Sequence, residues 1–138
     1  MSIIVSADIE AVFGVGNVAE WANLEGSGTS TVDTRIAASI AYAEGFLGDR
    51  LRKSKYVVPV SANGGSLTVI KNILAIYAGE WLYLSRGISN EAVIETLDNL
   101  KRWADDTVSA YLNGTMEMDA QLSDTDMPDC PVVVNGEG

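Results

Sequence analysis

Apolar residues recur every three or four positions along two long segments of the chain, which is the spacing of an amphipathic helix. The first segment, 30–51, carries the stripe Ile36, Ile40, Ala43, Leu47 and Leu51. The second, 91–113, carries Val93, Leu97, Leu100, Ala104, Val108 and Tyr111. Each stripe covers a single face, so both segments predict helices with one buried side and one exposed side.

The segment between them, Leu67 to Ser85, is apolar around nearly its whole circumference. A helix of this kind is buried on most sides, so we expect it at the centre of the fold, with part of it covered by a neighbouring subunit. A membrane span is the alternative. Lys71, Asn72 and Glu80 interrupt the apolar run, and no charge-free stretch reaches 18 residues, which disfavours a span.

Polar and glycine residues predict the remaining helix ends. Ser6 is a suitable cap for a short helix over Ala7–Phe13, and Gly14 ends it. Asn17 can begin a second short turn, Ser89 or Asn90 can cap the last helix, and Gly114 can end it. The predicted fold is an all-α bundle of three longer helices and one or two short N-terminal helices.

The chain changes character after residue 114. Residues 1–114 form the predicted helical domain, and residues 115–138 form an extended acidic tail with aspartates at 119, 124, 126 and 129. We expect this tail to pack against a partner chain. The tail residues assigned to that contact are Pro128, Pro131, Val132, Val133 and Val134.

Composition narrows the possible functions. The 138-residue chain has a formal charge of −10, which disfavours wrapping of duplex nucleic acid. It has no histidine and a single cysteine, Cys130, so no internal disulfide can form, and we see no signal peptide. These features are typical of a protein made in a reducing cytoplasm.

The acidic residues make poor candidates for catalysis or metal binding. Asp105 and Asp106 are adjacent on a helix and point in different directions, whereas Glu91 and Glu95 fit a solvated face. The run Asp124-x-Asp126-x-x-Asp129 lacks the glycine and the final acid of a calcium loop. We therefore assign no catalytic, cofactor-binding or metal-binding residue and predict that the protein is not an enzyme.

Four of the nine basic residues lie within six positions: Arg50, Arg52, Lys53 and Lys55. Cations at the C-terminal end of a helix complement its dipole, which accounts for part of the cluster. We expect the rest to contact an acidic face of a neighbouring subunit, where opposite charges fix orientation. Trp81 and Tyr83 on the central helix are further interface candidates; the alternatives are a role in the core or in nucleic-acid stacking.

Short motifs occur in a distinctive order along residues 5–115. Phe13-Gly14 ends the first helix, Gly45-Phe-Leu-Gly-Asp-Arg50 ends the long one, and an extended run reaches Pro59. Lys71 lies early in the apolar helix, Leu100-Lys-Arg-Trp103 lies in the next, and Gly114 follows. In this order the chain resembles the Mu-like family of head-completion (head–tail connector) proteins of tailed phages. It departs from the family at Asn63-Gly64-Gly65, where relatives have more proline, and in the density of charge at 52–55.

The resemblance implies an all-α structural adaptor of the virion, located in the neck at the head–tail interface. Such a protein docks under the portal after DNA packaging, as a homo-oligomeric ring expected to be twelvefold, and offers a surface to the neck or tail-completion protein. Genomic DNA would pass through the ring without sequence-specific binding. The alternative function is an acidic helical regulatory or inhibitor module that mimics DNA and binds a basic partner protein.

Overall fold

The computed structural model describes residues 3–23, 29–52, 54–56, 58, 60–85 and 90–120. Within these ranges the chain forms five α-helices: α1 (Ser6–Phe13), α2 (Val15–Ala22), α3 (Thr29–Leu51), α4 (Gly64–Ser85) and α5 (Glu91–Asn113). An isolated β-bridge joins Ala62 and Ala120. The predicted all-α bundle, with three longer helices and two short N-terminal ones, is confirmed.

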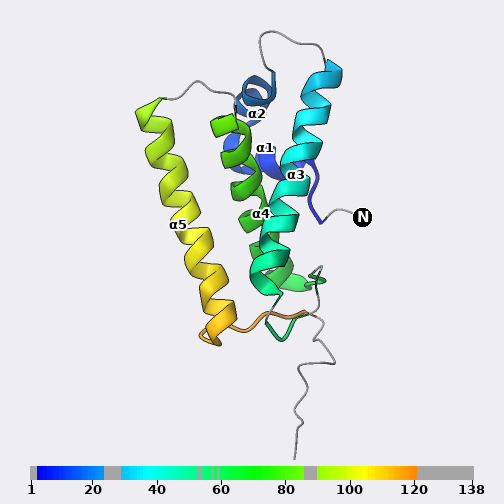
Figure 1. Ribbon diagram of the computed structural model, residues 1–138, viewed down its shortest axis with the longest axis vertical. Helices are drawn as coiled ribbons and strands as arrows, with labels where there is room; N and C mark the ends of the chain where they lie inside the picture. Colours follow the sequence, from blue (N-terminus) through cyan, green and yellow to red (C-terminus); the bar gives the residue numbers. More distant parts are fainter. Residues whose placement is uncertain are drawn as a thin grey trace, which may run out of the picture.

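Helix α4 runs through the middle of the molecule between α3 and α5, with α1 and α2 behind its C-terminal half (Figure 1). Half of its residues are buried, including Ile70, Leu74, Tyr77 and Leu82. The chain's own helices therefore cover most of the circumference of α4. From the sequence we expected a neighbouring subunit to cover part of it. Of its large apolar side chains, Leu84 remains 51% exposed. None of the described helices is long and apolar enough to cross a membrane.

The helix ends follow the predicted chemistry at two positions. The Asn90 side chain accepts a hydrogen bond from the Ala92 N–H (2.9 Å), so Asn90 rather than Ser89 caps α5. Gly114 ends the same helix in the left-handed conformation, with φ of 84°. The sequence therefore predicted both ends of α5.

The two short helices begin differently from the prediction. Val5, not Ser6, is the N-cap of α1, because the Asp8 carboxylate accepts the Val5 N–H (2.9 Å) and Ser6 already belongs to the helix. Helix α2 begins at Val15 rather than near Asn17, since Gly14 adopts a φ of 93° and turns the chain at once. The Asn17 amide donates to the Phe13 carbonyl (2.8 Å) and so ties α2 to the end of α1.

The segment that follows α5 packs on the helical domain. We call residues 115–120 the strap. It passes beneath the N-terminal end of α4 (Figure 1), where the Asp119 carbonyl accepts the Asn63 N–H (2.8 Å) and the Asp119 N–H donates to Ser66 Oγ (2.9 Å). Met118 is buried, and its N–H donates to the Tyr56 hydroxyl (2.8 Å). The domain boundary predicted after residue 114 thus falls just before a segment that contacts the helices.

Helices α1 and α4 approach each other closely at Gly79. A Cβ built on Gly79 would overlap the aromatic ring of Phe13. Glycine within a helix lowers stability relative to alanine by ~0.5–1 kcal/mol, so its presence in the middle of α4 has a packing reason. The ring of Phe13 occupies the space that any side chain at position 79 would need.

We expect Gly79→Ala to lower the free energy of unfolding by ~1–3 kcal/mol, because the new methyl group must displace the Phe13 ring. Gly45→Ala is the matched control. Gly45 is an exposed position in α3 with no atom within 4 Å of a built Cβ, so the same substitution there should raise stability by ~0.5–1 kcal/mol. Urea denaturation followed by circular dichroism measures both. Equal effects at the two sites would contradict the packing in the α1–α4 contact.

Candidate functional site

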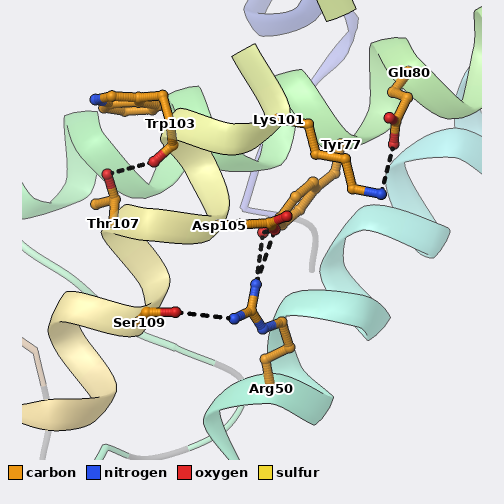
Figure 2. Close-up of polar contacts among 8 residues, drawn as sticks. All are labelled: Arg50, Tyr77, Glu80, Lys101, Trp103, Asp105, Thr107 and Ser109. Carbon is orange, nitrogen blue, oxygen red and sulfur yellow. Dashed lines mark hydrogen bonds and ion pairs between the residues drawn. The ribbon is translucent and has the colours of Figure 1, made fainter. Parts of the chain in front are cut away.

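Arg50, the first residue of the predicted basic cluster, turns inward. Its guanidinium forms an ion pair with Asp105 on α5 (Nη1 to Oδ1, 2.9 Å) and donates to Ser109 Oγ (3.4 Å) (Figure 2). Tyr77 of α4 donates its hydroxyl to the same Asp105 oxygen (2.8 Å) and accepts from Arg50 (3.4 Å). We call Arg50, Tyr77, Asp105 and Ser109 the three-helix network, since it joins α3, α4 and α5.

Burial raises the pKa of the Tyr77 hydroxyl well above its usual range, and its hydrogen bond to Asp105 adds to this effect. The phenol therefore stays protonated and acts as a donor in the three-helix network. A carboxylate that accepts from both a guanidinium and a phenol is held in one orientation. The Asp105 carboxylate thus joins α5 to α3 and α4, and Asp106, the adjacent acid, is exposed.

The other described cations of the basic cluster also have partners within the chain. Arg52 pairs with Asp49 (2.9 Å), and both side chains are more than two-thirds exposed. Lys55 pairs with Glu117 of the strap (2.9 Å), and the hydrogen bond between them raises the pKa of Lys55 and lowers that of Glu117. Lys53 lies outside the described residues. The cluster is thus divided between the interior, the surface and the strap, and of its described members Arg52 is the most open to a partner.

The two aromatic interface candidates on α4 lie in different surroundings. Trp81 is partly buried, with the Arg35 guanidinium 5.3 Å from its ring centroid and the Tyr42 ring at 6.4 Å. Tyr83 is 3% exposed, and its hydroxyl accepts the Asn90 N–H (2.6 Å). Trp81 can still be reached at its edge, whereas Tyr83 belongs mainly to the interior. Pro128, Pro131, Val132, Val133 and Val134 lie outside the described residues.

Sequence reasoning missed Arg35, which joins the ends of two helices. Its Nη2 donates to the Trp21 carbonyl near the end of α2 (3.4 Å), to the Leu82 carbonyl near the end of α4 (3.2 Å) and to Ser85 Oγ (2.8 Å). Helix C-terminal ends favour cations. Burial lowers the pKa of Arg35 from its usual value. In the sequence, the only indication of this role is that Arg35 is a lone cation early in a long helix.

An open groove of about 650 Å³ lies between α1–α2 and the N-terminal half of α5. We call it the α2–α5 groove. Trp21 and Tyr83 lie among its lining residues, together with apolar side chains of both walls. The full described lining is Val12, Phe13, Asn17, Glu20, Trp21, Tyr83, Asn90, Ala92, Val93, Thr96, Leu97 and Leu100. Sequence reasoning missed this groove because it treated Val93, Leu97 and Leu100 simply as a core stripe.

The acidic residues gather at no metal site within the described part of the chain. The run Asp124–Asp129 lies outside it. Glu80 is the one acidic side chain buried in the described ranges, at 7% exposure, and Lys101 Nζ lies 3.5 Å from its carboxylate (Figure 2). Burial raises the pKa of Glu80, although Lys101 opposes the shift.

The sequence matches no protein-family model and no curated protein, and a search of solved structures likewise found no match.

The three-helix network predicts a measurable coupling between Arg50 and Asp105, whose side chains are 25% and 38% exposed. A double-mutant cycle with Arg50→Ala and Asp105→Ala should give a coupling free energy of ~1–2 kcal/mol, reduced from a fully buried pair by solvent screening. The matched control is the cycle of Arg52→Ala with Asp49→Ala, a pair on the same helix end, which should give below ~0.5 kcal/mol. Equal coupling in both cycles would contradict the inward orientation of Arg50.

Glu80 predicts a pH-dependent effect on stability. A carboxyl whose pKa is raised in the folded state favours folding at low pH, and this contribution is lost as the pH rises through the folded-state pKa. Glu80→Gln should therefore raise the melting temperature at pH 7, and its advantage should shrink at and below the unfolded glutamate pKa of ~4.3. Thermal melts at pH 7 and pH 4 measure this difference. Glu95→Gln on the exposed face of α5 is the control and should change little at either pH. If Glu80→Gln were less stable than the parent at pH 7, this would contradict the inference that burial of the charged Glu80 carboxylate destabilises the folded protein.

Proposed function

We propose that the protein is a structural adaptor of a tailed-phage virion, a head–tail connector that docks as a ring under the portal after DNA packaging. In this role it provides the attachment surface for the neck or tail. The observation that carries the proposal is that the motifs behind the resemblance coincide with the junctions of the fold.

Three of the motifs lie at points where helices meet or end. In Phe13-Gly14, the aromatic side chain of Phe13 packs against Gly79 of α4, and Gly14 makes the turn into α2. In Gly45-Phe-Leu-Gly-Asp-Arg50, Leu47 is buried and Arg50 belongs to the three-helix network. Gly114 ends α5 before the strap. Residues at such positions determine how the helices are arranged, so their shared order supports a shared fold and, with it, the proposed role.

A closed ring needs two different complementary faces on each subunit. Arg52 and Lys53 are the proposed basic face, because the Arg52 side chain is 69% exposed, whereas those of Arg50 and Lys55 are 25% and 45% exposed. The proposed acidic face is the exposed side of α5, which carries Glu91, Glu95 and Asp98. With a formal charge of −10 per chain, a ring would repel the phosphates of passing DNA.

A second candidate, the acidic DNA mimic, is favoured by the same side of α5. Glu91, Glu95, Asp98 and Asp106 are all exposed, at spacings that keep them near one helical face. These four acids span ~22 Å of helix axis at 1.5 Å per residue. Duplex DNA carries one charge per ~1.7 Å, or roughly 13 charges over the same length. Arg102 also lies among these four acids, so the negative charge density of this face of α5 is low for a DNA mimic.

The test is electron microscopy of the purified protein with its candidate portal, and of the protein alone. We expect a coaxial ring below the portal. In the double variant Arg52→Glu, Lys53→Glu the ring should fail to close or dock, because the proposed basic face is reversed. The matched control is Lys71→Glu, a partly exposed cation on α4 outside both proposed faces, which should leave assembly intact.

The outcomes separate the candidates. Intact rings with the double variant would overturn the basic interface while leaving the adaptor role in place. Absence of binding to the portal, together with a compact monomer that captures a basic DNA-binding protein, would overturn the adaptor role in favour of the mimic. Arg50 is not used in this experiment, because its replacement would disturb the three-helix network rather than the surface.

A further inference from the structure

The α2–α5 groove is of the size that proteins use to hold small ligands or short peptide segments. Its volume of about 650 Å³ falls within the usual range of ~300–1,000 Å³. Val12, Phe13, Val93 and Leu100 contribute apolar side chains that are only partly buried there. Covering them would remove further apolar surface from water at a gain of ~25 cal/mol per Å².

The charge of the groove limits what can enter it. Among the described residues that line it, Glu20 is the only charged one. Glu20 already has an interaction of its own, and no described lining residue is a cation that could pair with an acidic segment. The occupant must be apolar and uncharged where it lies in the groove, with backbone groups that can reach Asn17 or Thr96.

The chain beyond the strap contains one segment with these properties. Beyond residue 120, acids occur at 124, 126, 129 and 137, and the run from Cys130 to Gly136 has none and includes three consecutive valines. We propose that the segment Pro131–Val134 occupies the α2–α5 groove of its own chain. This inference concerns the single chain and is independent of the proposed adaptor function.

The length of the chain permits this contact. The strap runs from the end of α5 across to the N-terminal end of α4 (Figure 1), where Ala120 pairs with Ala62. Of the α5 residues that line the groove, Leu100 is the one nearest in sequence to the end of that helix. The distance along α5 from Leu100 to Asn113 is ~20 Å at 1.5 Å per residue. The 11 residues from Ala120 to Pro131 reach ~36 Å when extended, which leaves room for a path around the helix.

An intramolecular contact is favoured over one between two copies. A short tether gives its segment an effective concentration in the millimolar range, far above that of a second protein molecule in dilute solution. We therefore assign the segment to the groove of the same chain.

Cys130, the only cysteine, gives a direct test, because it adjoins the proposed segment. A nitroxide attached to Cys130 of the full chain should remove most of the NMR signal intensity of Val93, Thr96 and Leu97, and reduction of the nitroxide should restore it. The signals of Ile36 and Ile40, which line a second groove of about 340 Å³ on the α1–α3 side, should keep their intensity.

Two variants serve as controls. Val132→Ser, Val133→Ser, Val134→Ser with the label on Cys130 should restore the groove signals, since the segment loses its apolar side chains. Moving the label with Cys130→Ser, Ser123→Cys should affect residues near Ala62 and spare the groove, because position 123 follows the strap closely.

Three results would overturn the inference. The first is no loss of signal at the groove in the labelled parent. The second is a loss centred on Ile36 and Ile40, which would assign the segment to the other groove. The third is an equal loss when chains that carry the nitroxide but no isotope are mixed with isotope-enriched chains that carry no nitroxide, which would assign the segment to a second copy.

Discussion

The structure depends on one constraint, the burial of an α-helix that is apolar around most of its circumference. Helix α4 can be stable in water only if other elements surround it, and full burial of each large apolar side chain contributes ~1.5–3 kcal/mol. Helices α3 and α5 cover α4 on two sides, and the two short helices pack behind its C-terminal half (Figure 1). The close approach at Gly79 is one result, since a helix surrounded on all sides must accept a neighbour where its own side chain is smallest.

Apolar burial alone would leave the order and orientation of the covering helices weakly defined, because apolar side chains can pack in several ways. Polar contacts supply what is missing. The three-helix network permits only one register of α3 against α5 around Tyr77, and Arg35 holds the ends of α2 and α4 together through carbonyl groups. These contacts lie at opposite ends of α3, so that helix is tied to its neighbours at both ends.

Local patterns in the sequence predicted the fold class, the long helices and the ends of α5, since these depend on neighbouring residues. They did not predict the direction of Arg50, because its partner Asp105 is 55 positions away and only the tertiary arrangement brings them together. The interaction of the basic cluster with the helix dipole therefore does not account for the position of Arg50, which pairs with Asp105 of another helix. The groove was missed for a related reason: a periodic stripe shows that Val93 and Leu97 face other helices, but not how closely those helices fit.

The strap determines how mechanical tension would enter the molecule. A pull on the chain beyond Ala120 would first reach the hydrogen bonds of Asp119 to Asn63 and Ser66, and so act on the first turn of α4 rather than on the end of α5. Because α4 is the element that all the other helices surround, force from the tail would be spread over the whole bundle. A segment without regular structure of its own thus serves as the mechanical anchor of the domain.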